Sequence, residues 1–139
     1  MDRAIVDAGP LIAFFDRKER YHDWVGAQVT RLESPLLVCE PVIAEAMYRL
    51  RHLPAAQEGI FAGLERGAFR IALHLEDQIP ALRYLHKKYR DQPMSLADAC
   101  VVRMAELHDR YAVLTLDSDF SVYRKHGRAP LTLIYPAQQ

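Results

Sequence analysis

The chain has 139 residues, of which 50% are hydrophobic and 26% charged. This length and balance predict one soluble globular domain and exclude a disordered or fibrous chain. Eighteen basic and eighteen acidic residues give a formal net charge of zero. The overall charge therefore does not favour a nucleic-acid-binding protein, and any such partner must be held by a local group of cations.

Apolar runs and helix-breaking residues predict alternating strands and helices in the first half of the chain. Pro10 stands in the first turn of the first predicted helix, where proline is favoured, and Gly67 ends the last one. The predicted elements are strands at residues 4–6, 36–39 and 69–73 and helices at 9–15, 22–32, 41–50 and 55–66.

The second half continues the alternation. An amphipathic helix is predicted over residues 76–90, and Ser95 caps a helix that is apolar almost all round and should be central and buried. The remaining predicted elements are a strand at 113–116, a short helix at 118–126 and a strand at 131–134. This order is typical of an α/β fold in which helices cover both faces of a parallel sheet of about five strands. We expect residues 1–139 to form a single domain.

Four acidic residues fall at places that such a fold brings together. Asp7 and Asp117 each follow a predicted strand, while Glu45 and Asp98 lie near the beginning of predicted helices. Ligands of open α/β sheets bind at the carboxyl ends of the strands, so these acids are candidates to face one cleft. Carboxylates held close together repel one another and favour a bound divalent cation or a raised pKa.

Each acid also has a purely structural alternative. Asp7 could cap the helix that follows it, and Ser95 with Asp98 has the spacing of a capping box. Glu45 has Arg49 one turn away as a surface partner. It lies roughly opposite the predicted apolar face of its helix, which contains Ile43, Met47 and Leu50.

The acids that follow the fourth predicted strand have a similar alternative. Asp117 and Asp119 flank Ser118, and either carboxylate could bond backbone amides of a turn. Taken one at a time, these alternatives leave the role of every acid open.

The joint pattern resembles the PIN domain family. Four segments carry the resemblance: IVDAGPLI at residues 5–12, VIAE at 42–45, SLADA at 95–99 and LTLDSDF at 114–120. Their order and spacing are similar to those of the small stand-alone members, the VapC-type toxin ribonucleases of bacterial toxin–antitoxin pairs.

This resemblance implies a three-layer α/β/α fold and a metal-dependent endoribonuclease that hydrolyses RNA phosphodiester bonds. It carries catalytic and metal-binding roles onto Asp7, Glu45, Asp98 and Asp117, and accessory roles onto Asp119 and Thr115. The implied cofactor is Mg²⁺, with Mn²⁺ as an alternative. A homodimer and a cognate antitoxin protein are implied as partners.

One position departs from the family pattern. Ala8 stands where the family commonly has Ser or Thr, and it has no hydroxyl group to orient a neighbouring carboxylate. This departure favours one alternative, a catalytically silent PIN-like binding protein. A solitary RNA-processing nuclease without antitoxin is another. A phosphoryl-transfer fold with a nucleophilic Asp7 is less favoured, because Gly9 occupies the place where such folds usually have a second Asp.

Other features narrow the remaining possibilities. The six histidines lack the spacing of zinc motifs, and no glycine-rich phosphate loop follows a strand. Cys39 and Cys100 are expected to be buried free thiols of a reducing compartment. With no apolar run long enough to span a bilayer, we expect a cytoplasmic protein without a membrane partner. Cations on two helices could contact RNA phosphates or simply be solvated: Arg49, Arg51, Arg83, Lys87, Lys88 and Arg90.

Overall fold

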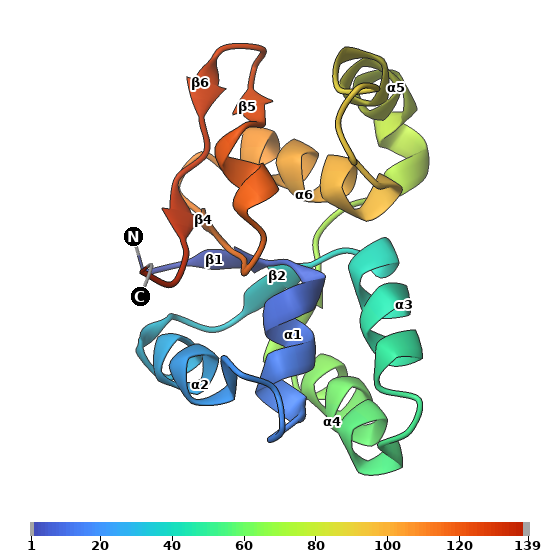
Figure 1. Ribbon diagram of the computed structural model, residues 1–139. Helices are drawn as coiled ribbons and strands as arrows, with labels where there is room; N and C mark the ends of the chain where they lie inside the picture. Colours follow the sequence, from blue (N-terminus) through green and yellow to red (C-terminus); the bar gives the residue numbers. More distant parts are fainter. Residues whose placement is uncertain (1, 138–139) are drawn as a thin grey trace.

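A parallel sheet of five short strands forms the centre of the protein, whose computed structural model describes residues 2–137 (Figure 1). The strands are β1 (Ala4–Val6), β2 (Leu36–Val38), β3 (Phe69–Ile71), β4 (Ala112–Leu114) and β7 (Leu133–Ile134), in the order β3-β2-β1-β4-β7. Ile5 on the central strand pairs with Leu37 on one side and Val113 on the other. β1, β2 and β4 are completely buried, which explains why their sequences are continuously apolar.

Helices cover both faces of this sheet. α5 (Ile79–Lys88) and α6 (Leu96–Leu107) pack together on one side, and α1 (Ala8–Phe15), α2 (His22–Arg31) and α4 (Pro54–Glu65) lie on the other (Figure 1). α3 (Glu40–Arg49) contacts both α1 and α6 and so joins the two helical layers. The structure confirms the predicted α/β/α arrangement and its parallel sheet of five strands.

α6 is central, as the sequence predicts. Its buried residues lie all round the helix, and only its ends are widely exposed, at Leu96 and Leu107. The helix contacts β1 and β4 as well as α3 and α5. The helix is therefore packed against the centre of the sheet.

The structure corrects the prediction of a helix over residues 118–126. Only a single 3₁₀ turn forms, η2 (Ser118–Ser121), and the chain then enters a small antiparallel hairpin of β5 (Arg124–Lys125) and β6 (Ala129–Pro130). His126 and Gly127 form its turn with positive φ angles of 55° and 77°. Two consecutive left-handed residues cannot continue a helix, and glycine adopts that conformation without steric cost.

Smaller differences concern the ends of elements. The third strand ends at Ile71 and the fourth at Leu114, and the last strand contains only Leu133 and Ile134. The amphipathic helix begins with a separate 3₁₀ turn, η1 (Leu75–Gln78). The buried face of α3 is formed by Val42, Ala46 and Leu50 rather than by the predicted Ile43 and Met47, which are only partly buried.

Both cysteines are buried and free, as predicted. Between residues 2 and 137, none of the helices has the length and apolar character needed to cross a membrane.

Candidate active site

The four acids named from the sequence line one cleft at the carboxyl end of the sheet. Its volume is about 370 Å³, and Ala8, Gly9, Leu116, Ser118 and Tyr135 complete its lining. Residues far apart in the sequence meet here because β1 and β4 are neighbouring parallel strands whose carboxyl ends point the same way. The structure therefore brings Asp7, Glu45, Asp98 and Asp117 together.

Asp7 is the most buried of these acids, with 6% of its surface exposed. It caps α1: one carboxylate oxygen, Oδ1, accepts a hydrogen bond of 2.8 Å from the amide of Ala8. The other oxygen, Oδ2, accepts one of 2.8 Å from the hydroxyl of Thr115. The pKa of Asp7 is raised to about 6. Burial is the main cause, the two hydrogen bonds oppose it, and the charges of Asp98 and Asp117 add to it.

Thr115 joins the ends of β1 and β4. Its hydroxyl donates to Asp7 and accepts a hydrogen bond of 2.9 Å from the amide of Asp117, and its side chain is fully buried. Thr115 thus supplies the hydroxyl that Ala8 lacks, from the neighbouring strand. The absence of Ser or Thr at position 8 does not leave the Asp7 carboxylate without an orienting hydroxyl group.

Asp98 has both of the roles that the sequence left open, in a helix cap and in the cleft. It forms the predicted capping box, in which its Oδ2 accepts from the amide of Ser95 at 3.0 Å and its own amide donates to the Ser95 hydroxyl at 3.0 Å. It also lines the cleft. Burial is the main cause that raises the pKa of Asp98, and the charges of Asp117 and Glu45 add to it.

Glu45 reaches the cleft from α3 while remaining exposed to solvent. Among the ion pairs formed within residues 2–137, none joins it to Arg49, so the surface pair considered as an alternative role for Glu45 is not formed. The buried face of α3, at Val42, Ala46 and Leu50, packs inward and leaves Glu45 on the side of the helix that faces the other acids.

Asp117 and Asp119 form the predicted turn. Asp117 caps η2, and its Oδ1 accepts a hydrogen bond of 2.9 Å from the amide of Asp119. Asp119 lies beside Asp117 rather than in the lining of the cleft. Desolvation, followed by the charge of Asp117, raises the pKa of Asp119.

The donor set of the cleft is suited to a hard divalent cation. All four acidic side chains offer carboxylate oxygens, which Mg²⁺ and Mn²⁺ prefer. In the part of the chain that the structure describes, however, no three His, Cys, Asp or Glu side chains are close enough to hold an ion together. The cleft thus fits a cation that contacts one or two carboxylates directly and the others through water, as Mg²⁺ commonly does.

Two polar residues of the lining were missed by the sequence reasoning. Ser118 follows Asp117, and Tyr135 follows the last residue of β7. The rule that pointed to Asp7 and Asp117, a polar residue at the carboxyl end of a buried strand, applies equally to Tyr135. It would have been found if the last strand had been treated like the first and fourth.

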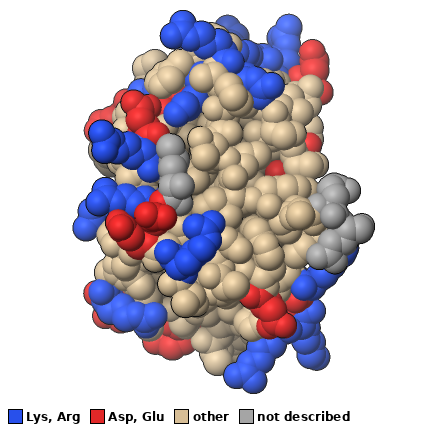
Figure 2. All heavy atoms as spheres, turned by 90° about the vertical axis from the view of Figure 1, so that its left-hand side faces the viewer, with Lys and Arg blue, Asp and Glu red and all other residues tan. Residues whose placement is uncertain are grey.

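Cations are unevenly placed around the molecule. Arg83, His86 and Lys87 of α5 line a groove of about 430 Å³ together with Leu96 and Ala99, which belong to the same first turn of α6 as Asp98. Arg51 instead donates to the carbonyl oxygen of its neighbour Tyr48. Figure 2, which views the molecule from the left-hand side of Figure 1, shows Lys and Arg mainly along the top, left and bottom of this face, with uncharged residues from its centre to the right.

A parallel α/β sheet with an acidic cleft at its carboxyl end is the arrangement expected of a PIN domain, and the sequence model of that family matches residues 4–126. The chain belongs to the PIN domain family. It is also 31% identical, over 133 residues, to Ribonuclease VapC26 of Mycobacterium tuberculosis. That alignment covers 94% of this chain and 98% of the relative.

Proposed function

We propose that this protein is a metal-dependent endoribonuclease of the VapC type and the toxin of a toxin–antitoxin pair. The observation that carries the proposal is the convergence of Asp7, Glu45, Asp98 and Asp117 on one cleft in a PIN domain. The name of the M. tuberculosis relative, a ribonuclease, supports RNA as the substrate class. We assign catalytic and metal-binding roles to these four acids and accessory roles to Thr115 and Asp119.

The residues of the cleft have distinct tasks in this proposal. Thr115 and the Ala8 amide fix both oxygens of Asp7, so that the carboxylate keeps one orientation. Ser95 holds one oxygen of Asp98, which also lines the cleft. A bound Mg²⁺ or Mn²⁺ supplies water activation and neutralises charge on the scissile phosphate. Asp7, Glu45, Asp98 and Asp117 would hold it, some of them through water.

Partners and organisation are part of the same proposal. We treat the chain as one domain, because a single sheet connects the N-terminal β1 with the C-terminal β7. A homodimer, a cognate antitoxin and a cytoplasmic location are inferred from the family. Sedimentation at micromolar concentration tests the dimer, and a small DNA-binding protein encoded in the adjacent reading frame tests the antitoxin.

Incubation of the purified protein with structured and unstructured RNA, with and without Mg²⁺, tests the activity. We expect cleavage with Mg²⁺ and none after chelation or in the Asp117→Asn variant. Cleavage that survives chelation would contradict metal dependence. If no RNA is cleaved while RNA still binds, the catalytically silent alternative is correct. Cleavage by a chain without an encoded antitoxin favours the solitary RNA-processing nuclease.

A further inference from the structure

Tyr123 carries a buried hydroxyl group without a partner. Its side chain is fully buried, and its Oη is the one buried side-chain oxygen or nitrogen, within residues 2–137, that forms no hydrogen bond. Leaving such a donor unsatisfied costs about 1–3 kcal/mol. A native protein that keeps this cost at a position next to a candidate active site requires an explanation.

The hydroxyl group lies near the acids of the cleft. Desolvation raises the pKa of Tyr123, and the charges of Asp98, Asp119 and Asp117 raise it further, so the phenol stays protonated and remains a donor. Asp98 acts on it through a hydrogen-bonding contact as well as through its charge. Of the three acids, Asp98 has the largest effect on the hydroxyl group, which nevertheless forms no hydrogen bond.

The ring itself is held firmly. It makes edge-on contacts with Tyr89 and Phe120, at centroid distances of 5.1 and 5.2 Å. The hydroxyl of Tyr89 accepts a hydrogen bond of 2.8 Å from the amide of Arg124, the residue after Tyr123. These contacts fix the position of the Tyr123 ring on two sides.

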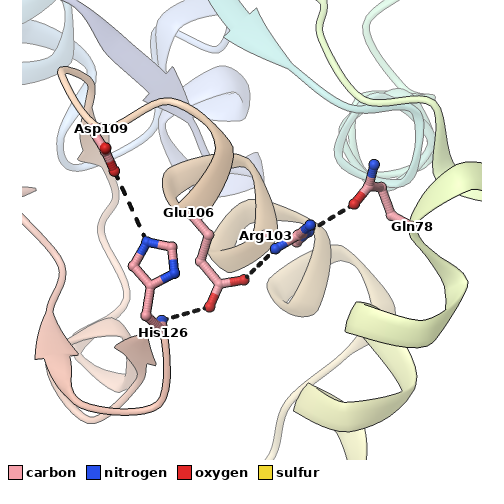
Figure 3. A network of polar contacts seen from close by, with 5 residues as sticks. All are labelled: Gln78, Arg103, Glu106, Asp109 and His126. Atoms are coloured by element: carbon pink, nitrogen blue, oxygen red, sulfur yellow. Dashed lines mark hydrogen bonds and ion pairs between the residues drawn. The ribbon is translucent and has the colours of Figure 1, made fainter.

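A polar network ties the segment that carries Tyr123 to the helix that carries Asp98 (Figure 3). Glu106, on α6, accepts from the amide of His126 in the hairpin turn at 2.7 Å and from Arg103 at 3.0 Å. Arg103 in turn donates to Gln78 of η1 at 2.7 Å. The two ends of the Tyr123–Asp98 contact therefore belong to elements that are fixed to each other.

We propose that Tyr123 is a positioning residue, whose hydroxyl group donates to the Asp98 carboxylate when a divalent cation occupies the cleft. Ser95 holds Asp98 from the side of the helix cap, and Tyr123 would hold it from the protein interior. This inference rests on the proposed metal site but not on RNA cleavage. It can therefore be tested by measuring the affinity of the protein for a divalent cation.

Two tyrosine variants form a matched pair for the test, because both remove one hydroxyl from the same aromatic cluster. Tyr89→Phe leaves the Arg124 amide without its acceptor, so its melting temperature should fall. Tyr123→Phe removes an unsatisfied donor, so the melting temperature of the metal-free protein should stay the same or rise. The two variants should thus differ in the sign of their effect.

Mn²⁺ binding, measured by calorimetry without RNA, gives the decisive readout. Removal of a group that hydrogen-bonds a ligating carboxylate typically weakens metal affinity or activity about 10- to 100-fold. We expect Tyr123→Phe to show a weakening in that range, Tyr89→Phe to bind like the wild type, and Tyr123→Phe to have no further effect in an Asp98→Asn background. In RNA cleavage, the same variant should lower kcat rather than raise KM.

The proposal is wrong if Tyr123→Phe binds Mn²⁺ as tightly as the wild type, or if the wild type binds no Mn²⁺. If Mn²⁺ affinity falls as expected but no RNA is cleaved, the positioning role stands and the ribonuclease function does not. Should Tyr123→Phe fail to fold, NMR of the folded protein replaces the variant. The tyrosine ¹³Cζ signals are then recorded in a Tyr135→Phe background, because Tyr135 also lines the cleft and would respond to a bound cation. One signal must then shift with Mg²⁺, and the shift must vanish in Asp98→Asn; no shift would overturn the proposal.

Discussion

The two sides of the cleft hold their acids in different ways. On the sheet side, Asp7 and Asp117 follow buried strands and are joined through the fully buried Thr115. On the helix side, Asp98 belongs to a capping box at the beginning of α6, and Glu45 projects from α3 into solvent. The acids of the sheet side are therefore held in place by burial, and those of the helix side by the geometry of their helices.

This difference teaches that a structural role and a chemical role are compatible in one side chain. Asp7, Asp98 and Asp117 each cap a helix or turn and each line the cleft. The energetic consequences differ, because a buried carboxylate loses hydration whereas a capping carboxylate satisfies backbone donors. Variants of the two sides should consequently change stability by different amounts and with different signs.

The largest loss of stability is expected from Thr115→Val. This change leaves the Asp117 amide and one oxygen of the buried Asp7 without their partner, which should cost about 2–3 kcal/mol. Urea unfolding of the metal-free protein measures it. Thr115→Ser keeps the hydroxyl and should retain most of the stability. Equal stability of the valine variant and the wild type would show that Thr115 does not join the two strand ends energetically.

Asp7→Asn should stabilise the metal-free protein at neutral pH. Raising the pKa of Asp7 from 3.8 to about 6 makes ionisation unfavourable in the folded state. At neutral pH, this rise of the pKa corresponds to a destabilisation of the folded state by about 3 kcal/mol. Because asparagine accepts only one of the two hydrogen bonds, we expect a net gain of about 1–2 kcal/mol, together with loss of the Mg²⁺-dependent rise in melting temperature.

The pH dependence of this effect has a definite sign. Since the folded-state pKa of Asp7 is raised, its contribution to stability is fully present below pH 3.8 and is lost as the pH rises through about 6. The advantage of Asp7→Asn should therefore grow over this window and be absent at lower pH. A variant that is less stable than the wild type at pH 7 and still responds to Mg²⁺ would identify Asp7 as a cap only.

Asp98→Asn should give a smaller gain than Asp7→Asn. Its charge is also disfavoured by burial and by neighbouring acids, but asparagine weakens the hydrogen bond from the Ser95 amide, and the two effects partly cancel. Thermal unfolding should show a change of less than about 1 kcal/mol, whereas Ser95→Ala should lose about 1 kcal/mol. A gain from Asp98→Asn equal to that from Asp7→Asn would mean that the capping box contributes nothing.

The smallest change in stability is expected from Glu45→Gln. Glu45 is exposed, and surface substitutions usually change stability by less than about 0.5 kcal/mol. Mn²⁺ affinity should nevertheless fall, because Glu45 lines the cleft. Arg49→Gln on the same helix is the control and should alter neither quantity. Unchanged affinity in Glu45→Gln would remove this residue from the metal site.

Much of the fold could be predicted because local signals and burial agree. The continuous apolar runs of β1, β2 and β4 are buried on both faces, and the all-round apolar sequence of α6 matches its central place. The prediction was wrong at residues 118–126, where apolar and polar residues are compatible with a helix. There the left-handed turn at His126 and Gly127 and the hydrogen bond from the His126 amide to Glu106 hold a hairpin instead.

The sequence by itself determined which acids follow strands or begin helices, since those positions depend on residues close along the chain. Only the tertiary structure decided that they share one cleft, that the hydroxyl of Thr115 serves Asp7 from a neighbouring strand, and that Tyr123 keeps an unpaired donor near Asp98. Thr115 and Asp7 are 108 residues apart. Contacts of this kind leave no local pattern, because they arise from the packing of strands and helices whose order in space differs from their order in the chain.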